Sequence, residues 1–450
     1  MTGQRAPHLL YVAWGFPPCR SGGVYRALAT VNAFARAGWR VTVLTADRET
    51  FERHTGTDPS MEERIDPSVR VVRVPFEWPT HDPDLRRWGW LRARSPRLWR
   101  RYRNLRDRVT FPEIGYGPWR LPLERAALAV HAADPVDLTV ASANPNVDFS
   151  PARKLFTAHG VPYVMDYRDA WLLDVFSGDQ LLPDSSLAAR FERRYVADAS
   201  EIWFVNEPIA QWHRERYPDR ADRIHVVANG FDPEFAPAPR RTPSPPDRPL
   251  RFGYIGTVSG RVPLGAFVEG WDLARERSPL LADAEAEIRG YLGFYASRDP
   301  SRVALLDRYA DRGVTYGGPV PKAEIAGVYE SYDVLLLILG AGRYVTSGKA
   351  YEYIASALPV VAVHDPGNAA TGLFEGHPRY FPVAEVTGEE VARALVAAAR
   401  SAREDSPQVI EKAAALGDRF SREHQLAPRI EALSRLVGFQ PETGTPEVAA

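Results

Sequence analysis

Residues 334–352 read VLLLILGAGRYVTSGKAYE, which is an apolar run, a glycine-containing turn and the start of a helix. The run 334–339 has the length and composition of a buried strand. The helix that begins at Ser347-Gly348 carries Lys349 in its first turn. Backbone N–H groups and the dipole at a helix start favour an anion, and Lys349 adds a positive charge beside them. The stretch therefore predicts a strand–turn–helix unit that holds a diphosphate without a metal ion.

This stretch differs from the phosphate-binding loop G-x-x-x-x-G-K-[ST]. Five residues separate Gly342 from Gly348 instead of four, and Ala350 stands where the magnesium-binding hydroxyl would be. Arg343, in the turn, can supply further positive charge. Glu352 follows Gly348 by about one turn and can accept hydrogen bonds from ribose hydroxyls. A surface ion pair of Glu352 with Lys349 is the alternative.

Strand-length apolar runs alternate with helix-length segments on both sides of this stretch. Such βαβ units form a mainly parallel sheet covered on both faces. A proline-rich segment, 236–249, interrupts the alternation and reads as a linker. The sequence therefore predicts an α/β protein of two facing, doubly wound, Rossmann-like domains with a deep cleft between them. The expected strands are 9–13, 40–45, 69–74, 138–141, 162–165, 202–205, 225–228, 250–255, 285–289, 314–316, 334–338 and 359–363.

The domain boundaries follow from the same pattern. Sheets of this kind bind ligands beyond the carboxyl ends of their strands, so the domain that contains Gly348 is expected to hold the diphosphate. The predicted parts are an N-terminal domain (1–235) completed by a helix near 421–437, the linker (236–249), a C-terminal domain (250–420) and a disordered tail (438–450).

Two groups in the N-terminal domain are further site candidates. Gly22 and Gly23 lie between the first strand and the first helix, where glycine lets a ligand approach the backbone. Asp166, Arg168 and Asp169 stand at the end of strand 162–165, where charges are costly to bury unless they are paired or used. They can orient hydroxyls of an acceptor or donor; a structural Arg168–Asp169 ion pair is the alternative.

Bulk composition limits the partners. The formal net charge is −1, and no nucleic-acid-binding module is recognisable, so we expect no nucleic-acid partner. Ten arginines, with tryptophans between them, crowd the segment from Arg86 to Arg108. This segment is either a solvated face whose aromatic residues pack locally, or a docking surface for an anionic acceptor or lipid headgroups.

The chain has one cysteine, Cys19, and no recognisable signal peptide or membrane-spanning run. We therefore expect a cytoplasmic protein, able to associate with the inner face of the membrane through residues 86–108. No zinc-ligand spacing is present, so no cofactor and no metal ion are expected.

Several short motifs, in their order along the chain, resemble those of GT-B glycosyltransferases, specifically the retaining family GT4. The resemblance covers most of the chain. It implies transfer of a sugar, with retention of configuration, from a nucleotide-sugar to a hydroxyl-bearing acceptor such as a bacterial glycan, glycolipid or natural product. The matching motifs are Phe16-Pro17-Pro18, Gly22-Gly23, 37–45, 163–171, 227–231, Tyr254-Ile255-Gly256-Thr257, 317–321, 332–336, 347–356 and 358–361.

The resemblance also implies residue roles. Gly22 and Gly23 would approach the sugar and diphosphate, Lys349 and the Gly348 amide would hold phosphate, and Glu352 would hold ribose. The implied catalytic group is Asp166, Arg168, Asp169 and Lys349. Donor contacts are implied for Thr257, Arg261, Arg343 and Ser347, and nucleobase contacts for Gly318, Pro319 and Val320.

Two departures from the family pattern bear on function. Tyr344 stands where many members carry a glutamate that binds a donor-sugar hydroxyl, and Arg261 has no lysine after it to complete the usual pair. Two alternatives to a transferase therefore stay open. One is a nucleotide-sugar epimerase on the same fold, and the other is a catalytically inactive partner protein that binds a nucleotide-sugar.

Overall fold

The chain is described from a computed structural model and divides into two compact units. The boundary lies at Val227, so residues 228–235, expected in the N-terminal domain, and the expected linker, 236–249, both belong to the second unit. The expected tail, 438–450, lies outside the described residues from 441 onward. Unit 1 comprises 1–174, 179–227 and 426–450, and unit 2 comprises 175–178 and 228–425. The described residues are 5–78, 84–234, 236–293, 299–321, 324–340 and 342–440.

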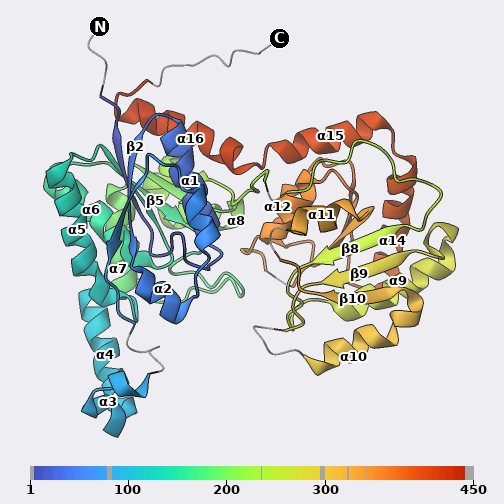
Figure 1. The fold of residues 1–450 in the computed structure, drawn as a ribbon, viewed down its shortest axis with the longest axis horizontal. Coiled ribbons are helices and arrows are strands. Elements are labelled where there is room, and N and C mark those ends of the chain that lie inside the picture. The colour runs from blue at the N-terminus through green and yellow to red at the C-terminus, as the bar shows by residue number, and fades with distance from the viewer. Residues whose placement is uncertain are drawn as a thin grey trace. The chain divides into compact units, whose positions relative to one another are not determined.

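Unit 1 is built on a seven-stranded sheet in the order β3-β2-β1-β4-β5-β6-β7. Neighbouring strands are parallel throughout. Helices cover both faces, as the continuous apolar character of the central strands requires (Figure 1). The strands are β1 His8–Val12, β2 Arg40–Ala46, β3 Arg70–Val74, β4 Leu138–Ser142, β5 Tyr163–Tyr167, β6 Glu201–Phe204 and β7 Ile224–Val226.

The final helix of the chain, α16 (Arg422–Leu436), packs its C-terminal part on unit 1. Trp39 Nε1 donates to Ser434 Oγ at 3.2 Å, and Arg429 lies 3.4 Å from Glu201. The other α-helices of unit 1 are α1 Val24–Arg36, α2 Arg48–His54, α3 Trp90–Arg94, α4 Pro96–Thr110, α5 Arg120–Ala133, α6 Phe149–His159, α7 Leu187–Asp198 and α8 Glu207–Arg216.

Unit 2 has a six-stranded parallel sheet in the order β10-β9-β8-β11-β12-β13. Every predicted strand of both sheets is present. The edge strand β13 was not predicted, because three residues around a proline give too weak an apolar pattern. The strands are β8 Arg251–Ile255, β9 Glu285–Arg289, β10 Val314–Gly318, β11 Val334–Ile338, β12 Val360–Val363 and β13 Tyr380–Pro382.

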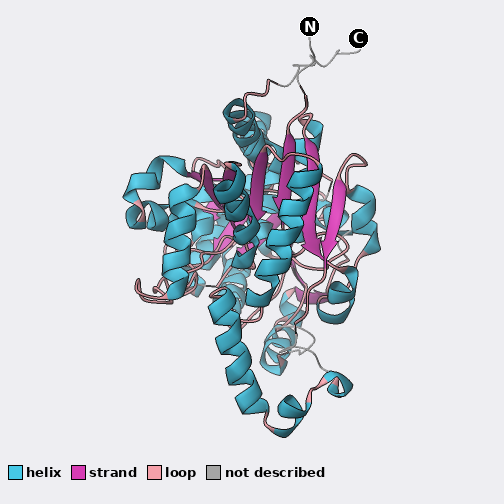
Figure 2. Cartoon of the chain, turned by 90° about the vertical axis from the view of Figure 1, so that its left-hand side faces the viewer, coloured by secondary structure: helices cyan, strands magenta, loops and turns pink. Residues whose placement is uncertain are grey.

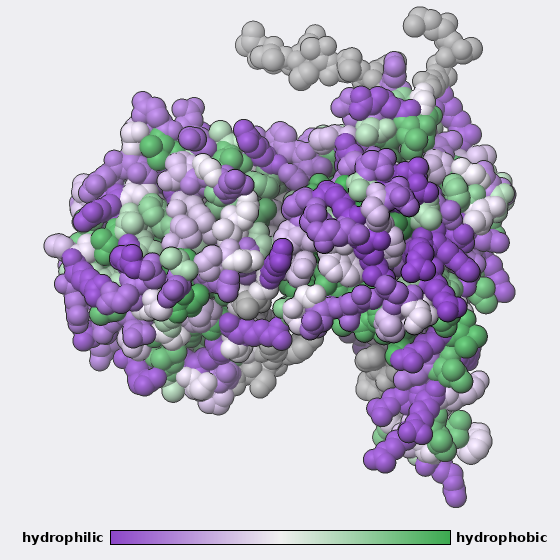
Figure 3. Space-filling model, turned by 180° about the vertical axis from the view of Figure 1, so that it is seen from behind, coloured by the Kyte–Doolittle hydropathy of each residue, from purple (hydrophilic) through white to green (hydrophobic). Residues whose placement is uncertain are grey.

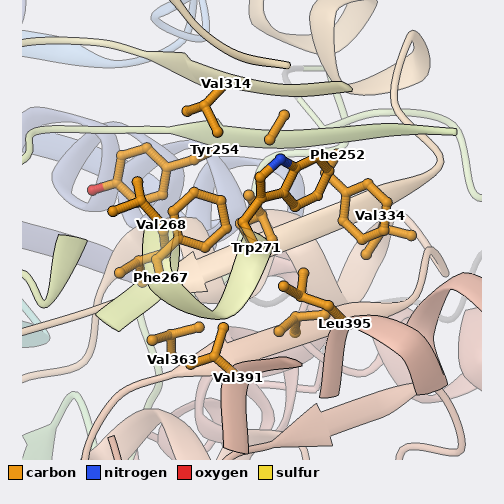
Figure 4. Packing of buried hydrophobic residues seen from close by; sticks show 14 of the residues in the cluster. Phe252, Tyr254, Phe267, Val268, Trp271, Val314, Val334, Val363, Val391 and Leu395 are labelled. Carbon is orange, nitrogen blue, oxygen red and sulfur yellow. The ribbon is translucent and has the colours of Figure 1, made fainter. Parts of the chain in front are cut away.

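The core of unit 2 packs around Trp271, which is fully buried (Figure 4). Its ring meets Phe252 edge to face, with centroids 5.1 Å apart. Gly270 lets two helices approach closely, since a Cβ there would stand 2.5 Å from that of Val391. The helices of unit 2 are α9 Leu264–Arg277, α10 Pro300–Arg308, α11 Ile325–Glu330, α12 Gly348–Ala355, α13 Ala369–Leu373, α14 Gly388–Glu404 and α15 Pro407–Asp418.

The segment 236–249 is bound along unit 2. Arg240 N donates to Ser356 O at 2.8 Å, Ser244 N donates to Ala402 O at 2.7 Å, and Arg248 forms a bidentate pair with the buried Asp333. Proline removes backbone donors, so side chains such as Arg248 supply part of the attachment.

Each sheet has one place where its strand order reverses, between β1 and β4 in unit 1 and between β8 and β11 in unit 2. Connections diverge there, which leaves a crevice outside the carboxyl ends of the strands. Both places are therefore the positions to examine for a ligand site. Among the described helices, none combines the length and apolar character that crossing a bilayer requires.

Candidate functional site

Glycines lie at or just after the carboxyl ends of four adjacent strands of unit 2. Gly256, Gly290 and Gly340 follow β8, β9 and β11, and Gly318 ends β10. Gly290 has φ of 119°, and a Cβ there would overlap the carbonyl of Gly256, so the ends of β8 and β9 approach closely. Because glycine has no side chain, this edge of the sheet is lined by backbone rather than by bulky side chains.

The start of α12 is open within unit 2. Ser347 is the N-cap and makes no side-chain hydrogen bond to the helix. Gly348 is exposed, and a Cβ built on it would meet no described atom within 4 Å. Among the described residues of unit 2, no side chain therefore fills the helix N-terminus that the sequence predicts as a diphosphate cradle.

Lys349 turns toward the end of β8. Its Nζ lies 3.9 Å from the ring centroid of Tyr254 and against Gly256, where a Cβ would overlap it. Burial lowers the pKa of Lys349 to about 7, and Glu352 opposes this shift. The side chain thus holds its amine at the reversal of strand order between β8 and β11, poised to gain a proton when an anion binds.

Glu352 follows Lys349 in α12, and Thr257 follows Gly256 after β8. Glu352 is half-buried and accepts a hydrogen bond of 2.7 Å from the phenol of Tyr329. Burial, and then the charge of Glu352, raise the pKa of Tyr329, which therefore stays a donor. Thr257 is exposed, and its carbonyl accepts from Tyr254 Oη at 3.1 Å. Both residues are oriented by tyrosines of the core.

The arginines of unit 2 differ in position. The backbone of Arg261 packs against Gly340 at the end of β11, which brings this residue to the same edge as Lys349. Arg343 is exposed, with its guanidinium 5.7 Å from the ring centroid of Tyr344. The predicted nucleobase residues Gly318-Pro319-Val320 lie at the end of the edge strand β10, which β9 separates from β8.

Unit 1 has a cavity of about 110 Å³ at its own reversal of strand order. Residues after β1 and at the end of β4 line it, together with the start of α1. Burial, then Glu113 and Asp148, raise the pKa of the lining Tyr116, so its phenol is neutral. The polar lining side chains are Ser21, Tyr116, Ser142, Asn144 and Arg168.

The structure brings the predicted glycine turn and Arg168 together. The guanidinium of Arg168 lies over Gly23, where a Cβ would overlap it. Asp169 is exposed and accepts a 2.7 Å hydrogen bond from Asn144 Nδ2, so it is joined to the cavity rim. Gly22 has no described atom within 4 Å of a Cβ position and stays open.

Asp166 is placed differently from the expectation that it acts on a substrate. It is fully buried, and both carboxylate oxygens bind Arg26, with the shortest distance 2.6 Å from Arg26 Nη2. Ser142 Oγ donates to the same carboxylate at 3.2 Å. Asp166 therefore fixes α1 and β4 behind the cavity and does not face it.

Two buried acidic residues, which the sequence did not indicate as part of the site, hold the loops around the cavity in place through hydrogen bonds. Glu113 accepts from the amides of Asn146 and Val147 at 3.0 and 2.8 Å, and Asp148 accepts from Trp14 N at 2.7 Å. Burial raises the pKa of Glu113 to about 7 and that of Asp148 well above its usual value. They hold the loop that carries Asn144.

Part of this cavity lining could have been predicted from a simple pattern in the sequence. The polar residue Ser142 ends an apolar strand and Asn144 lies just beyond it, while Arg168 and Asp169 directly follow β5. Glu113 and Trp14 have no such signal. Within the described part of the chain, no cluster of three or more His, Cys, Asp and Glu residues could hold a metal ion. The metal independence expected from the sequence stays a prediction.

Comparison with known proteins agrees with this architecture. No curated protein matches the chain in sequence. HepE of Anabaena, solved with UDP, is 16% identical with a TM-score of 0.60, covering 95% of this chain and 100% of HepE. A glycosyltransferase of Rickettsia africae is 13% identical with a TM-score of 0.63, covering 97% and 100%. A Listeria monocytogenes protein named as a UDP-N-acetylglucosamine 2-epimerase is 10% identical with a TM-score of 0.54, covering 97% and 99%.

These likenesses show the fold, which is GT-B. Residues 21–230 match the family model described as Glycosyl transferase 4-like domain. The matched region begins before the glycine turn, includes Arg168 and Asp169, and ends after β7. The chain therefore has the GT-B fold, and residues 21–230 of it are similar to a glycosyl transferase 4-like domain.

Proposed function

We propose that the protein transfers a sugar, with retention of configuration, from a nucleoside diphosphate sugar bound at the carboxyl edge of the unit 2 sheet to a hydroxyl-bearing acceptor. One observation carries the donor assignment: the N-terminus of α12 is open at Gly348, with the amine of Lys349 held beside it near Gly256. A helix N-terminus and a cation together bind a diphosphate electrostatically.

The neighbouring groups suit the rest of such a donor. Glu352 can accept from ribose hydroxyls, while Gly318-Pro319-Val320 can lie along the base. Thr257, Arg261, Arg343 and Ser347 complete the proposed donor contacts. HepE of Anabaena has been solved with UDP and with UDP-glucose, which makes UDP-sugars the first donors to test here.

In the proposed reaction the bond between the anomeric carbon and the diphosphate breaks as the acceptor oxygen attacks the same face. The acceptor proton passes to the departing phosphate oxygen. Negative charge grows on that phosphate, and a protonated Lys349 with the Gly348 amide stabilises it without a metal ion. In unit 1, Arg168 and Asp169 orient the acceptor hydroxyl, whereas Asp166 holds α1 in place through Arg26.

Calorimetric titration with UDP, GDP and ADP, followed by turnover assays with the corresponding sugars, tests the proposal. We expect Lys349→Ala to lower turnover by about 100-fold. Lys412→Ala removes an exposed lysine of α15 in the same unit and should leave turnover unchanged. Full activity after dialysis against EDTA supports metal independence. Normal turnover of Lys349→Ala would refute the phosphate role.

Two other functions make different predictions. The fold shared with the Listeria epimerase favours testing isomerisation, which would convert a nucleotide-sugar to its epimer in the absence of any acceptor. Tyr344, in place of the usual glutamate, favours testing for an inactive binding protein. Such a protein would bind the donor but show neither transfer nor hydrolysis, and Tyr344→Glu would be the variant to restore transfer.

A further inference from the structure

Helix α4 of unit 1 exposes a continuous apolar stripe. Leu98, Tyr102, Leu105 and Val109 are between 57% and 75% exposed. Their spacings of four, three and four residues place them within about 60° of arc on the helix surface. An apolar stripe of this kind ordinarily faces a protein core, so its exposure calls for a physical explanation.

Arginines border this stripe on both sides. Arg97, Arg101 and Arg108 lie along one border and Arg106 along the other, and all four are exposed. The one acidic residue of α4, Asp107, is 1% exposed and accepts from Gly115 N at 3.0 Å. The outward face of α4 is therefore apolar and positively charged, with no negative charge of its own.

The back of α4 is anchored, so the outward direction of the stripe is fixed. Arg92 stacks on Trp99, 4.6 Å from its ring centroid, and on Trp88 at 4.1 Å. At the C-terminal end, Gly117 packs so tightly on Asp107 that a Cβ would overlap the Asp107 carbonyl. Tryptophan–arginine packing is thus the local role of part of the segment 86–108, and it leaves the stripe outside.

Two more large apolar side chains are exposed in the elements that precede α4. Trp90 at the start of α3 is 77% exposed, and Leu85 is 69% exposed. Figure 2 shows α4 running away from the sheet of unit 1, with α3 beyond its far end. In the space-filling view, apolar side chains alternate with polar ones on this part of the surface, at the lower right of Figure 3.

We infer that α4, with Trp90 and Leu85, is an interfacial segment that binds the surface of an anionic lipid bilayer. The apolar stripe would enter the boundary between headgroups and acyl chains, and the bordering arginines would contact lipid phosphates. This inference goes beyond the proposed transfer reaction: it names the surface at which the enzyme works, and donor binding in unit 2 does not depend on it.

Other occupants fit the charges less well. A nucleic acid would neutralise the arginines but leave the four apolar side chains in water. A second copy of the chain would bring two arginine borders together across a twofold axis, which is repulsive. An acidic protein would have to offer an apolar groove between its carboxylates. A bilayer with anionic headgroups satisfies both the apolar and the charged parts of the face.

Co-sedimentation of the full chain with vesicles tests this inference. Vesicles of phosphatidylcholine alone are compared with vesicles that also contain phosphatidylglycerol. We expect binding to the anionic vesicles, and a loss of about tenfold or more in Leu98→Asn/Leu105→Asn/Val109→Asn and in Arg97→Gln/Arg101→Gln/Arg108→Gln. Circular dichroism melting and UDP binding verify that each variant is folded.

Matched controls separate the stripe from general surface effects. Leu121→Asn/Leu187→Asn/Leu436→Asn removes exposed leucines elsewhere, and Arg241→Gln/Arg400→Gln/Arg419→Gln removes exposed arginines elsewhere. Both controls should bind as the wild type does. Failure of the wild type to bind anionic vesicles, or equal losses in stripe and control variants, would overturn the inference. So would stripe variants that alter only self-association in light scattering or only RNA binding.

Discussion

Arg168 lies over the backbone of Gly23 so closely that no side chain fits between them, although 145 positions of sequence separate the two residues. The obstructing atoms belong to the end of a long side chain, which can move. A methyl group at position 23 would therefore displace the guanidinium and leave the fold intact.

Gly23→Ala and Arg168→Ala are expected to lower kcat/KM by similar factors, about tenfold or more, because both remove the guanidinium from the cavity. The double variant should be little worse than either single variant. Steady-state kinetics of the four proteins measure the coupling. Strictly additive losses would show that Gly23 acts independently of Arg168.

A substitution at Gly348 tests whether the open N-terminus of α12 binds the diphosphate, and it should hardly change the stability of the fold. Gly348→Val adds a side chain where the structure has free space, so stability should change little while UDP affinity falls about tenfold or more. Gly265 is the matched control: it is exposed in the first turn of α9, also with no described atom within 4 Å of a Cβ position. Calorimetry should find unchanged affinity in Gly265→Val. Equal affinities in both variants would place the diphosphate elsewhere.

Donor binding should depend on pH through Lys349, whose pKa burial lowers to about 7. A diphosphate favours the protonated amine and raises this pKa, so binding takes up a proton near and above pH 7. UDP affinity should fall as the pH rises from about 7 to about 9. Titrations in buffers of different ionisation enthalpy measure the uptake, which Lys349→Met should abolish and Lys412→Met should leave intact. Uptake that persists in Lys349→Met would assign the proton to another group.

Glu113 predicts a pH dependence of stability. Burial raises its pKa from 4.5 to about 7, so the folded protein holds this proton over a range in which the unfolded chain has released it. The free energy of unfolding should therefore fall by about 3 kcal/mol as the pH rises from about 4.5 to about 7. Denaturant titrations across this range measure the slope. Glu113→Gln should flatten it, and Asp148, whose pKa is also raised by burial, should supply the slope that remains.

The Arg26–Asp166 pair predicts a loss of stability rather than a loss of chemistry. Asp166→Ala leaves a buried guanidinium without its carboxylate and should cost about 3–5 kcal/mol. Replacing both partners, as in Arg26→Met/Asp166→Leu, should cost less than the single change. Chemical denaturation measures both. A stable Asp166→Ala protein with normal substrate affinity and greatly reduced turnover would return Asp166 to the catalytic group.

The strands and the open turn at Gly348 could be predicted because their signals are local. An apolar run marks a buried strand, and the residues that follow it lie at its carboxyl end. The environment of Asp166 could not be predicted in this way. Its partner Arg26 lies 140 positions earlier, and the sequence does not show whether a charge at a strand end faces inward or outward.

The stripe on α4 illustrates a second limit. The spacing of Leu98, Tyr102, Leu105 and Val109 is visible in the sequence, but the same spacing normally describes a helix face that packs on a core. Only the structure shows that Asp107, on the opposite side of the helix, is buried and that the apolar face is exposed. Periodicity identifies a face and does not say what covers it.

Arg26 also makes a hydrogen bond that connects α1 to the end of unit 1. Its Nη1 donates to the carbonyl of Val227 at 2.9 Å, and Val227 is the last residue of unit 1 before the chain passes into unit 2. One buried cation thus tethers the exit of the chain to the helix that starts at the glycine turn. A change at Arg26 would therefore disturb both the last residue of unit 1 before the crossing and the first turn of the helix that follows Gly23.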